Sequence, residues 1–429
     1  MAQTTMAVFD CSKPAAPIPM ASFSLKDNGD GHLEYEKYYL QRNDAFSIDP
    51  KHLRLQEKQI PVPRQADNTY GALSDAGPDA WGAKLRIRLL RKDKKQLPQN
   101  AVEWFLQSTH FGSGCLAFAA RPDELPRLCG VPGQSTCLTT RILDALDQYS
   151  TDPDQELDDE TANLLAPGSE LGGLRPKTIV MHDRVEHIAK FSRPDDQFDV
   201  PAVEYATLRL AHMAGITVPS FELLQIGTRS VLLIERFDRT EYGGRIHYLS
   251  ANSLLRPRPL SPDGREYKTS FSYAAIAEEL RPRNHAAPVD ANELFRRMVL
   301  NIMVGNVDDH LRNHALLMKE PGVSRLSPAF DICPHLEAPS RPQYIGVGDF
   351  GPASTILNAL SQCGRFFLTH DEAAAIVSEV KDVASSWRKV FADSGVTETD
   401  RYRLTRCFAV ADEAETVQVN LGLVPVGRG

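Results

Sequence analysis

The sequence lacks any apolar run long enough to span a membrane. A transmembrane helix needs roughly 18 or more mainly apolar residues in succession, and no stretch of the 429 residues approaches that length. The first residues, MAQTTMAVFD, also lack the basic stretch and the unbroken apolar core of a secretory signal. We therefore expect a cytoplasmic protein that makes no contact with a membrane.

Paired cysteines and an excess of positive charge are missing as well. The seven cysteines are scattered and none forms a C-x-x-C pair, which argues against a structural zinc site and a disulfide framework. The formal net charge of −8 is the opposite of what a protein built mainly to bind nucleic acid requires. What is present is an ordinary share of apolar residues, 42%, which suffices for two or three packed units.

The order of the expected elements predicts an α+β protein with two lobes. Strand-like segments such as KTIVM, EHIAKF and SVLLIERF precede residue 240, and helical patterns such as ANELFRRMVLNIMVG dominate after it. The acidic stretch 152–160 is the best candidate for a boundary. We predict an amino-terminal subdomain over 1–150, a nucleotide-binding part of a β-rich lobe over 151–240, and an all-α lobe over 241–429, with the site in the cleft between lobes.

The strongest local signal is the segment GNVDDHLRNH, residues 305–314. Asp308 and Asn313 have the spacing of the catalytic Asp and the metal-binding Asn in the protein-kinase loop H-R-D-x-x-x-x-N. A loop of this length lets a carboxylate meet a substrate hydroxyl while an amide oxygen reaches Mg²⁺ on the phosphates. Asp309 fits the spacing less well, and we expect it to be a surface or supporting group. Without the motifs below, a polar loop between two helices would explain the segment equally well.

A second acidic group, Asp331, follows a predicted pair of strands that turn at Pro321–Gly322. Magnesium takes hard oxygen ligands, so Asn313 and Asp331 are the candidate metal ligands. Phe330 and Ile332 flank this aspartate instead of the D-F-G of protein kinases, which makes it a distant analogue.

Two further segments suit a nucleotide. Lys190 ends a predicted strand and resembles the lysine that pairs with ATP phosphates; Glu204 on the next helix is a candidate partner, although the helical pattern favours a solvent-side position for it. In GSELGGLRPK, residues 168–177, the adjacent Gly172 and Gly173 would let backbone N–H groups approach phosphate oxygens.

Taken together, GGLRPK, AKF, IERFDR, NVDDHLRN and SPAFDI resemble, in this order, the HipA family of serine/threonine protein kinases. The segments GALSDAGPDAWG and FGSGCLAFA extend the resemblance over nearly the whole chain. The resemblance implies a two-lobed protein-kinase-like fold and the use of ATP and Mg²⁺. It also implies a protein substrate of the aminoacyl-tRNA synthetase class and a small helix-turn-helix antitoxin as partner, with DNA reached only through that antitoxin.

The resemblance also implies roles for single residues. Asp308 would be the catalytic base, and Asn313 and Asp331 would hold the metal ion. The nucleotide would contact Gly172, Gly173, Leu174, Arg175, Pro176, Lys177, Lys190, Glu235, Arg236, Phe237 and His310, with the adenine bonded to the main chain of 235–237. Family members can autophosphorylate a serine beside the Gly-rich loop; here Glu170 stands at that position with Ser169 next to it, which leaves self-inhibition open.

Three other functions stay open at this point. A metallohydrolase could use Asp308, Asp309, His310, His314 and Asp331, and it would bind a metal ion without affinity for ATP. The spacing of His310 and His314 suits a metal, but the Glu of H-E-x-x-H is missing, which favours a structural role. A catalytically idle corepressor acting with a DNA-binding antitoxin would bind ATP without turnover, and a kinase-fold enzyme could act on a small molecule or a lipid.

Overall fold

The computed structural model describes most of the chain. The described residues are 3–77, 80–107, 112–126, 175–241, 243–283 and 285–412, together with isolated positions between 140 and 162. Within these ranges, no helix combines the length and the apolarity needed to cross a membrane.

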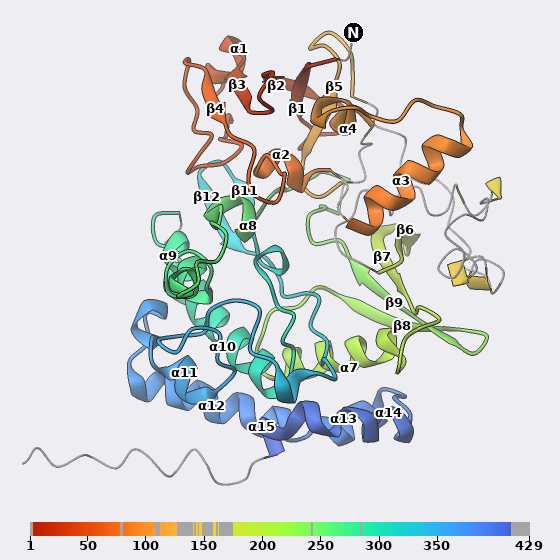
Figure 1. Ribbon diagram of the computed structural model, residues 1–429, viewed down its shortest axis with the longest axis vertical. Coiled ribbons are helices and arrows are strands. Elements are labelled where there is room, and N and C mark those ends of the chain that lie inside the picture. Colours follow the sequence, from red (N-terminus) through yellow and green to blue (C-terminus); the bar gives the residue numbers. More distant parts are fainter. Residues whose placement is uncertain are drawn as a thin grey trace, which may run out of the picture.

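An antiparallel five-stranded sheet forms the amino-terminal part of the molecule, at the top of Figure 1, in the order β4-β3-β2-β1-β5. Its strands are β1 (Thr5–Asp10), β2 (Ile18–Leu25), β3 (Gly31–Tyr35), β4 (Ile60–Val62) and β5 (Leu116–Ala119). The polar turn between β2 and β3 contains Gly29 at φ +85°, a conformation that glycine adopts without strain. On one face of the sheet, the ring of Phe23 packs edge to face against two other rings. The ring centroids lie 5.4 Å apart for Tyr70 and 6.3 Å apart for Phe105.

Four helices complete the described part of this amino-terminal region. They are α1 (Lys37–Leu40), α2 (Ala72–Asp75), α3 (Ala80–Lys92) and α4 (Ala101–Gln107). Of these, α2 contacts the elements that carry the site, as described below.

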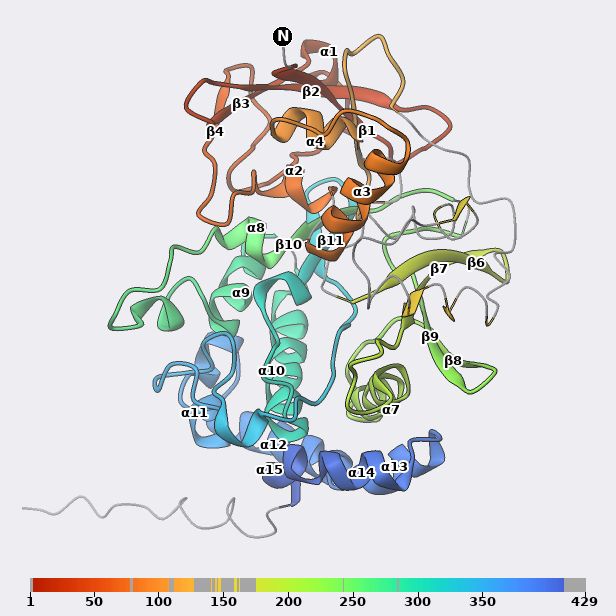
Figure 2. The same ribbon diagram turned by 45° about the vertical axis from the view of Figure 1, so that its right-hand side comes forward.

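A second antiparallel sheet follows, in the order β6-β7-β9-β8. Its strands are β6 (Lys177–His182), β7 (Val185–Phe191), β8 (Phe221–Ile226) and β9 (Arg229–Glu235). Helix α7 (Val200–Met213) packs against it, as Figure 2 shows. The side chain of Asp199 accepts a hydrogen bond from the N–H of Ala202 and so caps α7, and Pro201 occupies the first turn, where no N–H is needed.

The rest of the chain is mainly helical and surrounds α10 (Ala287–Val304). The other helices are α8 (Ala251–Leu255), α9 (Tyr273–Leu280), α11 (Ile356–Leu360), α12 (His370–Ala384), α13 (Trp387–Asp393), α14 (Glu398–Leu404) and α15 (Ala409–Asp412). The α+β class is confirmed, but this lobe is not all-α, because it contains the sheet β10 (His247–Ser250), β11 (Ala315–Glu320) and β12 (Val323–Leu326). The two strands expected around Pro321–Gly322 are β11 and β12, whereas β10 was not expected; it pairs with β11, more than 60 residues later in the chain.

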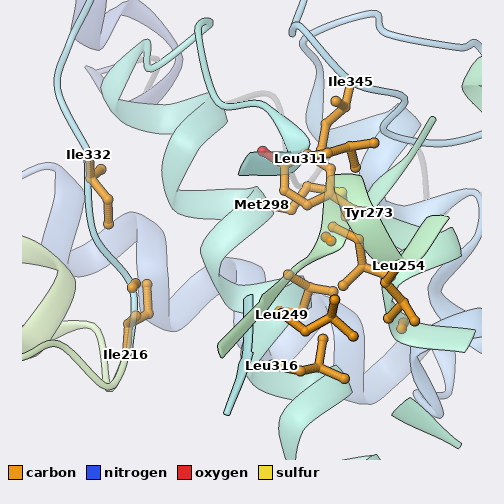
Figure 3. Close-up of a cluster of buried hydrophobic side chains, with 14 of the residues drawn as sticks. Ile216, Leu249, Leu254, Tyr273, Met298, Leu311, Leu316, Ile332 and Ile345 are labelled. Atoms are coloured by element: carbon orange, nitrogen blue, oxygen red, sulfur yellow. The ribbon is translucent and has the colours of Figure 1, made fainter. Parts of the chain in front are cut away.

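The proposed boundary at residue 240 lies just after β9, and the boundary proposed at 150 lies outside the described residues. One hydrophobic core runs through the amino-terminal sheet, α7 and the helices around α10. Part of it appears in Figure 3, where Tyr273, Met298 and Leu311 lie close to one another. Because Leu311 is 1% exposed and belongs to the segment 305–314, that segment is fixed directly to the core.

Candidate active site

The loop that carries Asp308 begins at the end of α10. Gly305 caps the helix in the left-handed conformation, at φ +68°. A Cβ atom at this position would lie 2.6 Å from the carbonyl oxygen of Cys407, so only glycine lets the chain turn here. The loop leaves α10 at this fixed point and returns to the sheet at β11.

The two adjacent aspartates of this loop have opposite environments. Asp308 is exposed and lines a cavity, whereas Asp309 is 2% exposed. The Oδ2 atom of Asp309 accepts hydrogen bonds from the Tyr273 hydroxyl, from Asn301 Nδ2 at 2.8 Å and from His314 Nε2 at 2.8 Å. Burial acts to raise the pKa of Asp309, but His314 and Tyr273 hold that pKa below its usual value. Asp309 is therefore the supporting group of the loop and not a surface residue.

This network also bears on the metallohydrolase hypothesis. His314 is buried against Asp309, and the ring of His310 lies 5.8 Å from that of Tyr344. Among the described residues, no group of three or more His, Cys, Asp or Glu side chains is placed to hold a metal ion. The described part of the chain thus does not assemble the cluster that a metallohydrolase would need.

Lys190 forms two ion pairs, one within its own lobe and one that links it to the following lobe. Its Nζ atom lies 2.6 Å from Glu204 Oε1 on α7 and 2.8 Å from Asp331 Oδ1, which follows β12. Burial acts to lower the pKa of Lys190, but the charges of Asp331 and Glu204 raise that pKa above its usual value. Glu204 is 3% exposed, so its expected solvent-side position was wrong: α7 turns this residue toward the sheet, where the lysine compensates its burial.

Asp331 has an unusual backbone. Its φ is +60°, a left-handed conformation that costs free energy in residues other than glycine, asparagine and aspartate. Its side chain is 49% exposed, and the charge of Lys190 holds its pKa well below the usual range. The carboxylate therefore stays ionised at the edge of the cavity, where its second oxygen can meet a cation.

Two adjoining cavities form one groove around these residues. They share Lys177, Lys190, His310, Asn313 and Asp331 and have volumes of about 180 and 440 Å³. The first is walled by apolar groups, among them the rings of Phe237 and Phe330, which lie 5.4 Å apart. The second contains Asp308 and Glu204. One end of the groove thus suits a planar apolar ring and the other suits charged groups.

At the end of β9, fewer main-chain N–H groups are available to a ligand than we expected from the sequence. The N–H of Glu235 donates to the carbonyl of Ser220, and the N–H of Arg236 donates to the carbonyl of Glu186. Within the described residues, the N–H of Phe237 has no such acceptor. Of the three amides expected to meet a ring, that of Phe237 is the one left for it.

The Arg236 side chain binds the amino-terminal part of the chain. Its Nη2 atom donates to the carbonyl of Gly112 at 2.9 Å and to Asp238 at 2.8 Å, and Asp238 accepts from the N–H of Gly114 at 2.8 Å. Arg239 also pairs with Asp238, at 2.9 Å. This segment therefore fixes the loop 112–114 beside the groove, and Ser113 becomes part of the groove wall.

Two further contacts join the amino-terminal part to the site. Asp75 on α2 accepts hydrogen bonds from the hydroxyls of Ser250 and Ser253, both at 2.8 Å, and burial raises its pKa to about 6. Arg312, in the loop of Asp308, lies 2.6 Å from Asp67. No sequence pattern indicates these pairs, because their members are at least 175 residues apart.

Part of the expected phosphate loop can be placed. Ser169, Glu170, Gly172, Gly173 and Leu174 lie outside the described residues. Pro176 leads directly into β6, whose Lys177 pairs in register with Lys190 of β7. Arg175, one of the residues implied to contact the nucleotide, forms an ion pair, since its Nη1 atom lies 2.7 Å from Asp196 Oδ1.

Comparison with known proteins decides the family. The model of the HipA-like C-terminal domain matches residues 169–387, half of the chain. The chain belongs to the HipA family. A putative kinase of Sinorhizobium fredii is 27% identical over 244 residues, which are 52% of this chain and 54% of that protein. The serine/threonine-protein kinase toxin HipA of Shewanella oneidensis is 23% identical over 193 residues, 39% of this chain and 43% of that protein.

These matches leave part of each relative uncovered, since this HipA-family chain spans about half the length of the curated relatives it matches. The fold extends further than the sequence match. A solved structure of HipA with HipB and operator DNA from Shewanella oneidensis MR-1 aligns over 95% of this chain and 96% of its own, with a TM-score of 0.63 at 15% identity. The expected HipA-like fold is thereby confirmed.

Proposed function

We propose that this HipA-family protein is a serine/threonine protein kinase that transfers the γ-phosphoryl group of ATP with the help of Mg²⁺. The observation that carries the proposal is the double ion pair of Lys190 with Glu204 and Asp331, in the same groove as Asp308 and Asn313. Phosphoryl transfer depends mainly on positioning and charge neutralisation, which a buried lysine between two carboxylates provides.

The donor set of the groove fits a magnesium ion. Asn313 and Asp331 supply an amide oxygen and a carboxylate oxygen to one cavity, and Mg²⁺ binds through one or two such groups together with phosphate oxygens. A bound Mg²⁺ would neutralise charge on the phosphates. Asn313 is 7% exposed and its backbone N–H donates to the carbonyl of His310 at 2.8 Å, which fixes the main chain at this residue.

Asp308 has the free carboxylate of the loop. It is exposed within the groove and, among the described residues, accepts no hydrogen bond, whereas Asp309 is occupied by three donors. We assign to Asp308 the orientation of the substrate hydroxyl and the acceptance of its proton. The ring of Phe237 and its free N–H would hold the adenine, while Lys190 and Lys177 would face the phosphates.

The substrate and partner follow from the family. We propose a protein substrate of the aminoacyl-tRNA synthetase class, whose phosphorylation would inhibit translation. We also propose a small helix-turn-helix antitoxin, as the complex of the Shewanella HipA with HipB and DNA suggests. Ser169 is the proposed site of autophosphorylation.

Incubation with [γ-³²P]ATP, Mg²⁺ and a cell lysate tests the proposal. The parent protein should label a lysate protein on serine, and Asp308→Ala should reduce labelling by about 100-fold or more without changing the melting temperature. Asp382→Ala, an exposed aspartate on α12, is the matched control and should retain full activity. Full labelling by Asp308→Ala would remove this residue from the mechanism, and ATP binding without any transfer would favour the idle corepressor.

A further inference from the structure

A separate cavity of about 810 Å³ lies behind the segment that ends β9. It shares Glu235 and Arg236 with the groove, so the two spaces lie on either side of this segment. Its other walls come from the end of β1, the turn between β6 and β7, residues 245–247 and the turn between β11 and β12. The proposed kinase mechanism uses no side chain that is confined to this cavity.

The buried arginines on one wall of this cavity are not all paired. Arg236 and Arg239 pair with Asp238 and Glu186 at distances between 2.8 and 3.5 Å. Arg245 adds a third guanidinium, which forms no ion pair with either carboxylate. A buried guanidinium without an ion-pair partner is costly unless an anion completes it.

Arg245 is the member of this cluster without a partner. It is 6% exposed, and its Nη2 atom is buried with no hydrogen-bond acceptor. No carboxylate of the described residues lies within ion-pair distance of its guanidinium, although the residue lines the cavity. Burial and the neighbouring Arg236 lower its pKa, although the charges of Asp238 and Glu186 act to raise it.

His247 also lines this cavity, but its polar atoms are covered. The ring is 3% exposed, and its Nε2 atom donates to the carbonyl of Ile48 at 2.9 Å because a carbonyl can only accept. Its Nδ1 atom is buried beneath protein atoms and has no donor. The cavity therefore presents the remaining exposed surface of the Arg245 guanidinium, and not His247, as its polar group for a ligand.

The remaining lining limits the charge of a ligand. Lys13, Arg184 and Lys319 contribute positive charge, but acidic residues are at least as numerous: Asp10, Asp44, Glu235, Glu241 and Glu320. Polyanions such as nucleoside triphosphates would be repelled by these carboxylates. A ligand with one anionic group and a neutral or hydroxylated body fits this distribution.

We propose that this cavity is a second ligand site, which binds a small molecule with a single carboxylate or phosphate group against Arg245. Because Arg236 lies between this cavity and the groove, occupation of one space would be felt in the other through the same segment. The proposal is independent of whether the groove transfers phosphate.

Thermal denaturation of the full chain with inorganic phosphate or with acetate tests this site. Both probes are titrated in low-salt buffer against the parent, Arg245→Met and Arg184→Met, which removes a rim charge from the same cavity. We expect the probes to raise the melting temperature of the parent and of Arg184→Met, and the apparent affinity to fall at least tenfold in Arg245→Met. The acetate and phosphate arms tell which anionic group the site prefers.

The stability of Arg245→Met without any probe is a further control, because the direction of its change is predicted. Removal of an unpaired buried charge should leave Arg245→Met at least as stable as the parent in anion-free buffer. An unchanged response of Arg245→Met to both probes, no response of the parent to either probe, or marked destabilisation of Arg245→Met without a probe would each overturn the proposal. Arg245→Lys keeps the charge and should keep the response, weakened by no more than about tenfold; loss of all response in this variant would also count against it.

Discussion

Asp309 and Asp308 are adjacent, but we expect their replacement to have different effects on stability. Asp309→Ala should destabilise the fold strongly, whereas Asp308→Ala should hardly change its stability. Asp309→Ala removes the acceptor of three buried donors, on Tyr273, Asn301 and His314. A hydrogen bond to a charged group contributes about 1.5–3 kcal/mol, and each donor left without an acceptor costs about 1–3 kcal/mol. Water entering the vacated space offsets part of this loss, so we expect a destabilisation of roughly 3–5 kcal/mol.

The melting temperature should fall accordingly, on the order of 10 °C, if each kcal/mol shifts it by about 2–4 °C. Asp308→Ala is the matched control: an exposed side chain without partners should change stability by less than about 0.5 kcal/mol. Tyr273→Phe removes one of the three donors and should cost about 1.5–3 kcal/mol of stability. In the double variant with Asp309→Ala, the total loss should be smaller than the sum of the two single losses.

The pH dependence gives an independent check. The pKa of Asp309 is lower in the folded protein than its usual value, so its ionised form stabilises the fold above about pH 4. That contribution is lost as the pH falls through the lower folded pKa. The difference in the free energy of unfolding between the parent and Asp309→Ala should therefore have nearly its maximum value at pH 5 and should become smaller below about pH 4. A gap that is absent at pH 7, or a loss as large for Asp308→Ala, would refute the reasoning.

Four other predictions follow from the same contacts. Lys190→Met should reduce phosphate transfer about 100-fold or more and lower the melting temperature, because Glu204 is left buried and unpaired; adding Glu204→Gln should restore the melting temperature but not the labelling. Asp238→Ala should cost about 3–5 kcal/mol in urea denaturation, since it leaves two buried guanidinium groups to share Glu186 as their one carboxylate. Phe237→Ala should weaken the binding of a non-hydrolysable ATP analogue about tenfold by calorimetry, a loss of about 1.4 kcal/mol. Asp75 has a folded pKa of about 6, above its unfolded value, so its ionisation opposes folding; the parent should lose roughly 3 kcal/mol between pH 4 and pH 7 that Asp75→Asn does not lose.

Local pattern was sufficient for the parts of the site that lie on single segments. The spacing of Asp308 and Asn313, the strand that ends near Lys190 and the pair of strands before Asp331 are all visible in short windows, and the structure brings these side chains to one groove. Their chemical roles stay predictions until the labelling experiment is done. The family resemblance supplied the order of the segments, which no single motif provides.

Contacts between distant segments could not be foreseen. The burial of Glu204 depends on how α7 meets the sheet, and helical periodicity alone does not tell a buried carboxylate with a lysine partner from a solvated one. In the same way, the sequence around Asp309 resembles that of a surface residue. Its burial depends on Tyr273, 36 positions earlier, whose hydroxyl donates a hydrogen bond to its carboxylate. The segment ERFDR suggested contacts of the main chain, while its charged side chains bind a loop more than 120 residues away.

The links between the amino-terminal sheet and the later lobes have a practical meaning for anyone dissecting this chain. The family match starts at residue 169, which invites expression of that piece by itself. In such a piece, Arg312 would lose its ion pair with Asp67. Ser250 would lose its hydrogen bond to Asp75, and Arg236 would lose its bond to the Gly112 carbonyl. The hydrophobic core that the two parts share would also be divided. Deletion experiments on this chain should therefore keep its first 126 residues, since the half with the reactive groups would otherwise lose these contacts.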